Sequence, residues 1–224
     1  MRRRQGNGAR TDVVRLVGSN RDEGSFAAGF GPPMTAQRWQ DSAQQRWGDA
    51  AALGMRAYPA ATDGEAAANN TRIFADNMAW ITRKFAEQQR AKSKHVYVYH
   101  FVHEPPYAPG ARNLGACHTC ELPYVFDNLS TLRLYPDSSS PELAVASAAD
   151  IKIAKTMSAY WINFAKTGDP NGAGLPKWPV FENVANGPVL HINEAPVVGD
   201  SLGPDKVQLY KALYDKQMSA TTAP

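Results

Sequence analysis

A histidine lies between two cysteines in the tetrapeptide Cys117-His118-Thr119-Cys120. A pair of cysteines at this spacing can bind a zinc ion or act as a redox dithiol. An imidazole in a loop can instead serve as the general base of a hydrolase. These are the only two cysteines in the chain, so the residues around them must decide between metal, redox and acid–base chemistry.

The metal and redox hypotheses lack the residues that they need. A structural zinc site takes four ligands, usually from two spaced pairs, and the chain has no second pair of cysteines. His95, His100 and His103 are further candidate ligands, but two of them alternate with strand-forming residues in a segment that should be buried. A redox pair normally opens a helix, whereas Pro123 closely follows this one. We therefore predict no metal and no cofactor, interpret the cysteines as small, partly buried side chains, and keep a small zinc-binding protein as the weakest alternative.

The acid–base hypothesis offers His118 a partner. Glu23 lies in a loop directly after a β-branched segment, and His118 also lies in a loop that follows a predicted strand. An acid followed later in the chain by a histidine is the order of the α/β-hydrolase triad, in which the serine comes first. In that triad the imidazole takes the serine proton, while a buried carboxylate fixes its tautomer and stabilises the imidazolium. Asp22 is the competing acid, and the residues alone do not separate it from Glu23.

Three well-separated segments resemble the C-terminal part of the type-B carboxylesterases, the family that includes the cholinesterases and the bacterial para-nitrobenzyl esterases. The segments are LVGSNRDEGSF at 16–26, LGACHTCELPYVF at 114–126, and YWINFAKTGDPNG with LPKWPVF within 160–181. The resemblance extends from residue 13 to about residue 195. Thr119 is a mild departure, because the family commonly has a small residue after its histidine.

The resemblance implies the C-terminal portion of an α/β-hydrolase fold over 13–224, after a basic, disordered start at 1–12. It places the triad acid at Glu23 and the base at His118. Glu121 is then either a carboxylate that supports this pair from behind or a solvated loop residue. The implied activity is hydrolysis of small-molecule carboxylic esters through an acyl-enzyme, with no cofactor or metal.

The serine nucleophile of this family is not found upstream of Glu23. The family's serine lies in a G-x-S-x-G turn, but only 22 residues precede Glu23, and Ser19 has none of the required glycines. We therefore expect a chain that supplies the acid and the base but is inactive alone. Its missing partner would be an N-terminal half of the fold that carries the serine and the oxyanion segment. The alternative is a catalytically inactive, hydrolase-like module that binds partners.

A G-x-S-x-G pattern does occur later in the chain, at Gly199-Asp-Ser-Leu-Gly203, and contains Ser201. It follows His118, which reverses the triad order, and no histidine lies beyond His191. Short glycine motifs arise easily by chance. We interpret this segment as a turn.

The loops that carry Glu23 and His118 need strands to position them. A β-branched segment at 13–17 and an aromatic, β-branched segment at 96–102 predict strands ahead of the two loops, with residues 19–24 as the first loop. A last strand pair or hairpin is predicted at 189–198. Strands that alternate with helices predict an α/β sheet in a single unit.

Apolar spacing predicts three helices, after a region of short helices and irregular structure at 31–70. The first helix spans 71–91, and its apolar face is formed by Phe74, Met78, Ile81 and Phe85. The second spans 151–167 and ends at Gly168, with an apolar face formed by Ala154, Met157, Trp161 and Phe164. A terminal helix is predicted at 207–214.

Composition excludes several classes of protein. Hydrophobic residues make up 43% of the chain and aromatic residues 10%, which is enough to form a core. The net charge is +3 without a basic stripe that alternates with aromatic residues, so nucleic-acid binding is not predicted. No apolar segment is long enough to span a bilayer. The basic start lacks the apolar part of a signal peptide, which predicts a cytoplasmic protein if the chain is complete and leaves secretion open if it is truncated.

Overall fold

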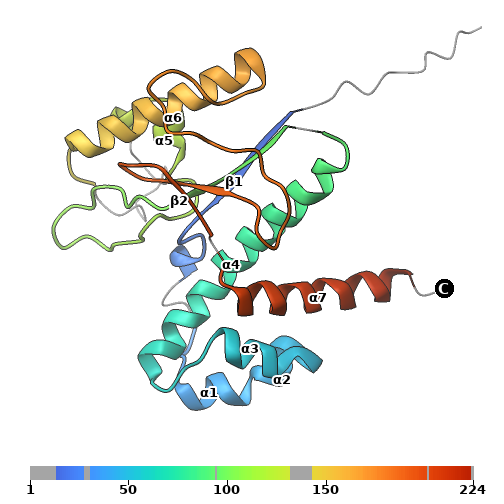
Figure 1. The fold of residues 1–224 in the computed structure, drawn as a ribbon. Helices are drawn as coiled ribbons and strands as arrows, with labels where there is room; N and C mark the ends of the chain where they lie inside the picture. Colours follow the sequence, from blue (N-terminus) through green and yellow to red (C-terminus); the bar gives the residue numbers. More distant parts are fainter. Residues whose placement is uncertain (1–13, 28–30, 94, 132–142, 201, 223–224) are drawn as a thin grey trace, which may run out of the picture.

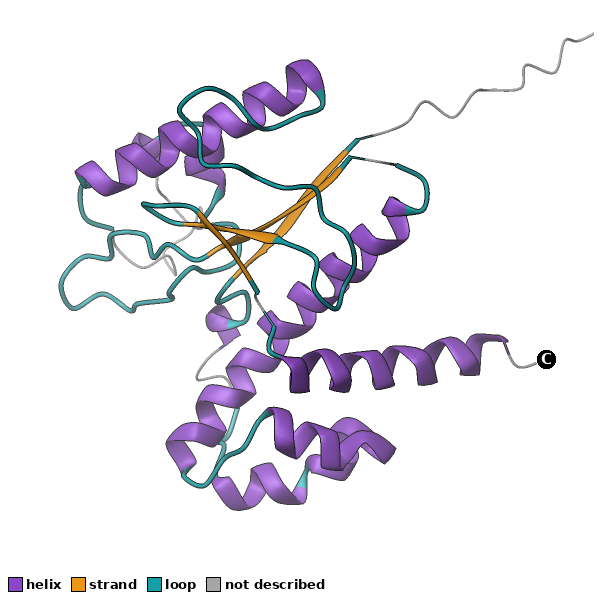
Figure 2. Ribbon diagram, in the orientation of Figure 1, coloured by secondary structure: helices purple, strands orange, loops and turns teal. Residues whose placement is uncertain are grey.

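The computed structural model describes residues 14–27, 31–93, 95–131, 143–200 and 202–222. The basic start predicted at 1–12 lies outside these residues. A sheet occupies the centre of the molecule, and helices lie on both of its faces (Figures 1 and 2). The predicted α/β class is therefore confirmed.

The sheet has four strands in the order β1-β2-β3-β4. Their bounds are β1 (Arg15–Asn20), β2 (Val96–Phe101), β3 (Val189–Ile192) and β4 (Val197–Gly199). The first three strands are parallel, and β4 returns antiparallel to β3. The predicted strands are present, but β1 continues to Asn20, through two residues that we predicted as loop. Within the described part of the chain, β1 forms one edge of the sheet.

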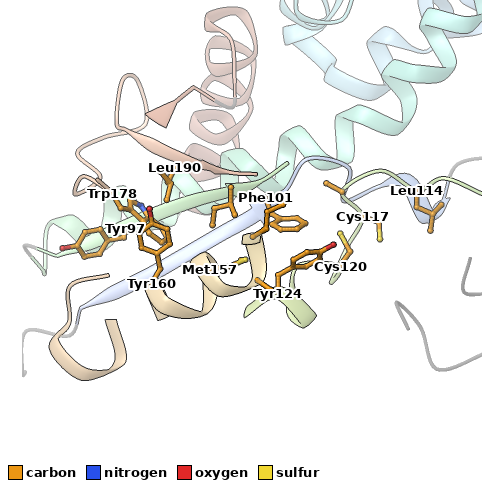
Figure 3. Close-up of a cluster of buried hydrophobic side chains, with 14 residues drawn as sticks. Tyr97, Phe101, Leu114, Cys117, Cys120, Tyr124, Met157, Tyr160, Trp178 and Leu190 are labelled. Atoms are coloured by element: carbon orange, nitrogen blue, oxygen red, sulfur yellow. The ribbon is translucent and has the colours of Figure 1, made fainter. Parts of the chain in front are cut away.

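Two long helices cover the sheet from opposite sides. Helix α4 (Asp63–Arg90) packs against β1 and β2, and helix α6 (Ala148–Thr167) lies on the other face beside the short helix α5 (Leu122–Val125). On one face, Phe101 of β2 shares a buried cluster with Met157 of α6 (Figure 3). On the other face, Val98 of β2 shares a cluster with Ala86 of α4. The sheet thus has an apolar layer on each side, as expected for parallel strands covered by helices.

Helix α4 begins at Asp63, earlier than the predicted residue 71. The hydroxyl of Thr62 accepts a hydrogen bond from the main-chain N–H of Glu65, and the Glu65 carboxylate accepts one from the N–H of Thr62. This reciprocal capping box gives partners to two N–H groups that would otherwise lack them at the start of a helix. The first two turns carry few large apolar residues, so apolar spacing alone did not detect them.

The predicted apolar face of α4 is mostly exposed, and a different face of the helix packs on the sheet. Phe74, Ile81 and Phe85 are 47%, 51% and 40% exposed, and Met78 is only partly buried. The buried positions of the helix are Ala66, Ala75, Asp76, Ala79, Trp80, Arg83 and Ala86. The alanines let the helix approach the sheet closely, and Phe74, Ile81 and Phe85 lie on the outer side. We call Phe74, Ile81 and Phe85 the exposed stripe, together with Phe26, whose ring meets Phe74 edge-on at 6.2 Å between centroids.

The predicted apolar face of α6 is confirmed. Ala154 and Met157 are fully buried, and Trp161 and Phe164 pack against the same cluster while partly buried. Gly168 follows the helix with φ of 77°, in the left-handed conformation that ends many helices.

The region 31–70 contains the predicted short helices, and these pack with the C-terminal helix. Their bounds are α1 (Ala36–Asp41), α2 (Ala43–Trp47), α3 (Ala51–Ala57) and α7 (Pro204–Thr222), with single 3-10 turns at η1 (Ser25–Ala27), η2 (Gly48–Ala50) and η3 (Leu129–Thr131). The hydroxyl of Tyr58 donates to Asp76 at 2.9 Å and lies 2.8 Å from the hydroxyl of Tyr210, which ties α4 to α7. None of the helices in the described ranges is long and apolar enough to cross a membrane.

Candidate active site

The parallel pairing of β1 and β2 brings the acid loop and the histidine loop together. Beyond the strands, the N–H of Asp22 donates to the carbonyl of Ala116 at 3.0 Å, and Asp22 forms an isolated parallel bridge with Cys117. The carboxyl ends of neighbouring parallel strands meet at one edge of a sheet, where ligand sites of α/β proteins lie. Two loops far apart in sequence therefore form one site.

His118 and Glu23 are in direct contact. Nδ1 of His118 lies 2.6 Å from Oε2 of Glu23. Because a carboxylate only accepts hydrogen bonds, this contact places a proton on Nδ1 and leaves Nε2 for a reacting group. The Glu23 side chain is 7% exposed and the His118 side chain is 52% exposed. The buried acid thus holds an imidazole whose other side is open to solvent.

The second oxygen of the Glu23 carboxylate also has a partner. The main-chain N–H of Asn20 donates to Oε1 at 2.8 Å. Both oxygens are therefore occupied, one by the loop backbone and one by His118. A buried carboxylate needs such partners to offset the loss of hydration.

Asp22, the competing acid, faces away from His118. Its Oδ2 accepts from the main-chain N–H of Ala116 at 2.8 Å and from Nε of Arg21 at 2.8 Å. Asp22 therefore fastens the histidine loop to the acid loop through the backbone. The structure thus gives Asp22 and Glu23 different partners, which their place in the sequence alone did not distinguish.

Glu121 lies behind the pair. Its Oε2 accepts a hydrogen bond from Nδ2 of Asn20 at 2.5 Å. Burial raises the pKa of Glu121, and the nearby Glu23 carboxylate acts in the same direction. Of the two alternatives, a half-buried carboxylate that supports the pair fits this environment better than a solvated loop residue. Asn20 was missed by the sequence analysis, although it lies within the acid-loop segment.

The histidine loop contains two residues in the left-handed backbone conformation. Gly115 has φ of 64° and Thr119 has φ of 67°. A side chain at position 115 would also overlap the carboxylate of Asp22. Glycine is therefore required at 115 for both its backbone angle and its missing Cβ. Thr119, which departs from the family pattern, bears the cost of a left-handed conformation.

The two cysteines are free thiols in the core. Both Cys117 and Cys120 are fully buried and belong to the cluster that contains Phe101 and Tyr124 (Figure 3). They are thus more buried than we predicted. Burial raises the pKa of Cys120 well above its usual value. Among the residues that the structure describes, no group of three or more His, Cys, Asp or Glu side chains is arranged to hold a metal ion.

Two of the histidines considered as further zinc ligands have other partners. Nδ1 of His100 lies 3.2 Å from the hydroxyl of Ser19, and burial lowers the pKa of His100 to about 3. Nε2 of His103 lies 2.7 Å from Oδ1 of Asp150, at the start of α6. Both contacts belong to the packing of the sheet and its helices.

We expect the purified chain to contain no stoichiometric zinc, because its paired thiols are buried without further ligands arranged around them. Elemental analysis after dialysis checks this, with Cys117→Ser/Cys120→Ser as the matched variant. The native chain and the variant should have the same background zinc content. A content of about one zinc per chain, lost in the variant, would contradict the prediction, because structural zinc sites depend on their thiolates.

The later G-x-S-x-G pattern lies between β4 and α7. Oδ1 of Asp200 accepts hydrogen bonds from Arg83 at 2.6 Å and from the N–H of Leu202 at 3.0 Å. Arg83 is 1% exposed, so Asp200 compensates a buried charge on α4. Ser201 itself lies outside the described residues. Asp200 therefore contacts α4 and the main chain just ahead of α7.

Comparison with known proteins identifies a family that this chain matches. The model of the carboxylesterase family matches residues 4–210. Fumonisin B1 esterase of Sphingopyxis macrogoltabida is 30% identical over 203 residues, which cover 88% of this chain and 35% of that protein. Phenmedipham hydrolase of Pseudarthrobacter oxydans is 31% identical over 208 residues, which cover 89% of this chain and 40% of that protein.

Solved structures show the same fold. A PNB esterase superposes with a TM-score of 0.61 at 21% identity, and the match covers 87% of this chain and 37% of that chain. A thermophilic PNB esterase superposes with a TM-score of 0.60 over the same shares of the two chains. The chain thus has an α/β-hydrolase fold in common with these esterases and spans less than half the length of the proteins that it matches.

Proposed function

Because the chain belongs to the carboxylesterase family, we propose that it carries the acid and the base of a serine carboxylesterase. In this proposal, residues 13–224 form the C-terminal portion of the enzyme's domain. The observation that carries it is the 2.6 Å contact between Nδ1 of His118 and Oε2 of Glu23. A histidine held in this way on a buried carboxylate at the carboxyl ends of parallel strands matches the acid–base half of a hydrolase triad.

The chemistry assigned to His118 consists of two proton transfers in each half of the reaction. Nε2 takes the serine proton as the serine oxygen attacks the ester carbonyl, and then gives that proton to the departing alcohol. In the second half, Nε2 takes a proton from water, which attacks the acyl-enzyme, and returns the proton to serine as the acid leaves. Glu23 remains ionised throughout and stabilises the imidazolium that forms at each step.

We propose that the nucleophile and the oxyanion donors come from a segment outside the 224 residues. No G-x-S-x-G pattern precedes Glu23 in the sequence. Ser19 does not replace it, because its side chain lies buried on the sheet against His100. The later pattern around Ser201 stands in the wrong order for this fold.

The partner that we propose for this chain is the N-terminal portion of the same fold. Two features support it. In the described part of the chain β1 is a sheet edge, and an unpaired edge can accept a further strand. The exposed stripe lies on η1 and on α4, which packs directly against β1, and grouped exposed apolar residues usually mark an interaction surface.

The proposed substrate is a small-molecule carboxylic ester. The names of the matched proteins, among them fumonisin B1 esterase and human cocaine esterase, are those of ester hydrolases. The chemistry of the pair fits this class, because an imidazole base and a buried acid serve acyl transfer without a metal. A hydrolase-like module that only binds partners is the second candidate.

We expect the chain alone to hydrolyse short-chain nitrophenyl esters no faster than its His118→Ala variant. The physical reason is that the base has no nucleophile to activate and no oxyanion donors to complete the site. Initial rates under identical conditions, corrected for buffer hydrolysis, check this. Turnover that is blocked by an organophosphate and lost in Ser201→Ala would instead assign the reaction to Ser201.

A further inference from the structure

Asn20 is the last residue of β1 and is 1% exposed. It makes three hydrogen bonds within the candidate site. Its main-chain N–H donates to Oε1 of Glu23 at 2.8 Å. Its side-chain Nδ2 donates to the carbonyl of Cys117 at 2.7 Å and to Oε2 of Glu121 at 2.5 Å. One buried residue therefore contacts the acid, the backbone next to the base and the supporting carboxylate.

The two bonds from Nδ2 cross between loops that lie far apart in sequence. Cys117 directly precedes His118, so the bond to its carbonyl fixes the peptide unit from which the base projects. Glu121 ends the same loop, just before α5. The amide of Asn20 thus holds the histidine loop on both sides of His118.

The histidine loop needs these hydrogen bonds to stay in position. His118 is half exposed, so close packing does not orient its ring. Its neighbour Thr119 is in the left-handed conformation, which a non-glycine residue adopts only when its surroundings enforce it. Among the described residues, the ring is oriented by its contact with Glu23 and by the position of its own backbone.

We propose that Asn20 is a positioning residue for His118, which acts through the carbonyl of Cys117 and the carboxylate of Glu121. The inference rests on the proposed function, because it concerns the placement of the proposed base. Holding the histidine loop through these two hydrogen bonds needs a neutral amide, because a charged or apolar residue of similar size does not make both bonds.

The neutral amide suits the electrostatics of its surroundings. Glu23 is buried and Glu121 is half-buried, and each accepts one hydrogen bond from Asn20. An aspartate at position 20 would lose both Nδ2 donors and add a carboxyl group against Glu121. Such a pair can share one proton at low pH, but two adjacent carboxylates repel when both ionise. The titratable groups around this position are Glu23, Glu121, His118, Cys117, Cys120, Tyr99, Asp22 and Arg21.

The test uses the full chain with ¹⁵N-labelled histidine, observed by NMR. The His118 signals are assigned by their loss in His118→Gln. In the native chain, the proton on Nδ1 should give a downfield signal because it bonds to a buried carboxylate. Asn20→Ala should weaken or abolish that signal, while its main-chain N–H still binds Glu23.

Asn20→Asp gives a reversible version of the same test in one folded sample. At low pH, with both carboxyl groups protonated, the carboxyl at position 20 can donate to the carbonyl of Cys117 and accept from Glu121, so the His118 signal should resemble that of the native chain at the same pH. As the pH rises and both carboxyls ionise, the signal should be lost, and acidification should restore it. The native chain, titrated in parallel, should keep the signal at the pH at which the variant has lost it.

Asn171→Asp is the matched control. Nδ2 of Asn171 also donates to a carboxylate, that of Asp169 at 2.6 Å, and to a main-chain carbonyl, that of Trp178 at 2.9 Å. It lies in the loop after α6 and does not touch the site. This variant should lower stability but leave the His118 signal unchanged.

The second readout is catalysis by the chain co-expressed with an N-terminal segment that carries the serine turn. Asn20→Ala should lower kcat by roughly 10²-fold, the effect of about 1 Å of misplacement, and leave KM within about twofold. A folded Asn20→Ala chain with a native His118 signal would overturn the inference, whatever its activity. If the native pair has no esterase activity but the His118 signal depends on Asn20, the proposed function fails and the positioning role stands.

Discussion

In a chain reconstituted with an N-terminal segment that carries the serine turn, Glu23→Gln should lower kcat by about 10⁴-fold, the loss typical of a triad acid. The amide of glutamine can donate to Nδ1 and thereby favour the wrong tautomer of His118. It also removes the charge that stabilises the imidazolium. His118→Ala should cost at least as much, because no group then takes the serine proton. The measurement is the steady-state hydrolysis of nitrophenyl esters at saturating substrate.

Glu104→Gln is the control for this pair of variants. Glu104 contacts Arg21 at 2.6 Å beside the acid loop and is 46% exposed, but it does not touch His118. Its substitution should leave kcat within about twofold, since exposed ion pairs contribute little. The assignment of the acid would be wrong if Glu23→Gln retained native turnover and Asp22→Asn abolished it. The double variant Glu23→Gln/His118→Ala should lose little more activity than the worse of the two single variants. The reason is that triad residues act as a unit, so their losses do not add.

Gly115→Ala should lower the free energy of unfolding by about 3 kcal/mol and displace the histidine loop. The left-handed conformation at this position costs an alanine about 1–2 kcal/mol, and the overlap with the Asp22 carboxylate adds a packing penalty of similar size. Movement of Asp22 to relieve the overlap would break its hydrogen bond to the N–H of Ala116. Urea unfolding followed by tryptophan fluorescence measures the loss of stability.

Gly110→Ala provides a matched control for the contribution of the backbone angle. Gly110 also has a positive φ, of 81°, but a Cβ there would meet nothing within 4 Å. Its substitution should cost only about 1 kcal/mol, the strain of the conformation itself. If the two variants lost the same free energy of unfolding, the contact with Asp22 would contribute nothing to the loss of stability in Gly115→Ala. The reconstituted enzyme should lose activity in Gly115→Ala and keep it in Gly110→Ala.

Much of the fold could be predicted from local pattern. The aromatic, β-branched segment of β2 and the turn-rich chain around β3 and β4 have few alternative structures. Helix α6 was predicted with the correct face because its large apolar residues are the ones that pack on the sheet. The order of the residues and their place after strands suggested an acid partner for His118, but only the resemblance to the type-B carboxylesterases favoured Glu23 over Asp22.

Other features could not be predicted because they depend on contacts between distant segments. On α4, Phe74, Ile81 and Phe85 face outward while alanines and Trp80 are buried, so apolar spacing alone selects the wrong face for packing on the sheet. The different roles of Asp22 and Glu23 depend on which way each loop side chain points. Asn20 carried a usable signal, since it lies in the acid-loop segment, but its three bonds exist only after the two loops meet.

Because β1 and β2 pair in parallel, the candidate site can form only after the chain between the two strands has closed into a loop. Arg15 pairs with Val96, so the strands meet only after residues 16–95 have closed into a loop that contains α1–α4. Closing a loop of this length costs entropy before any cross-strand contact compensates for it, and non-local pairing of this kind slows folding. Helices α4 and α6 can form from local contacts while Glu23 and His118 are still far apart. The acid–base pair is therefore expected to form late in folding. A protease that cut the chain within α1–α3 before then would prevent the pair from forming, although it would cut neither residue.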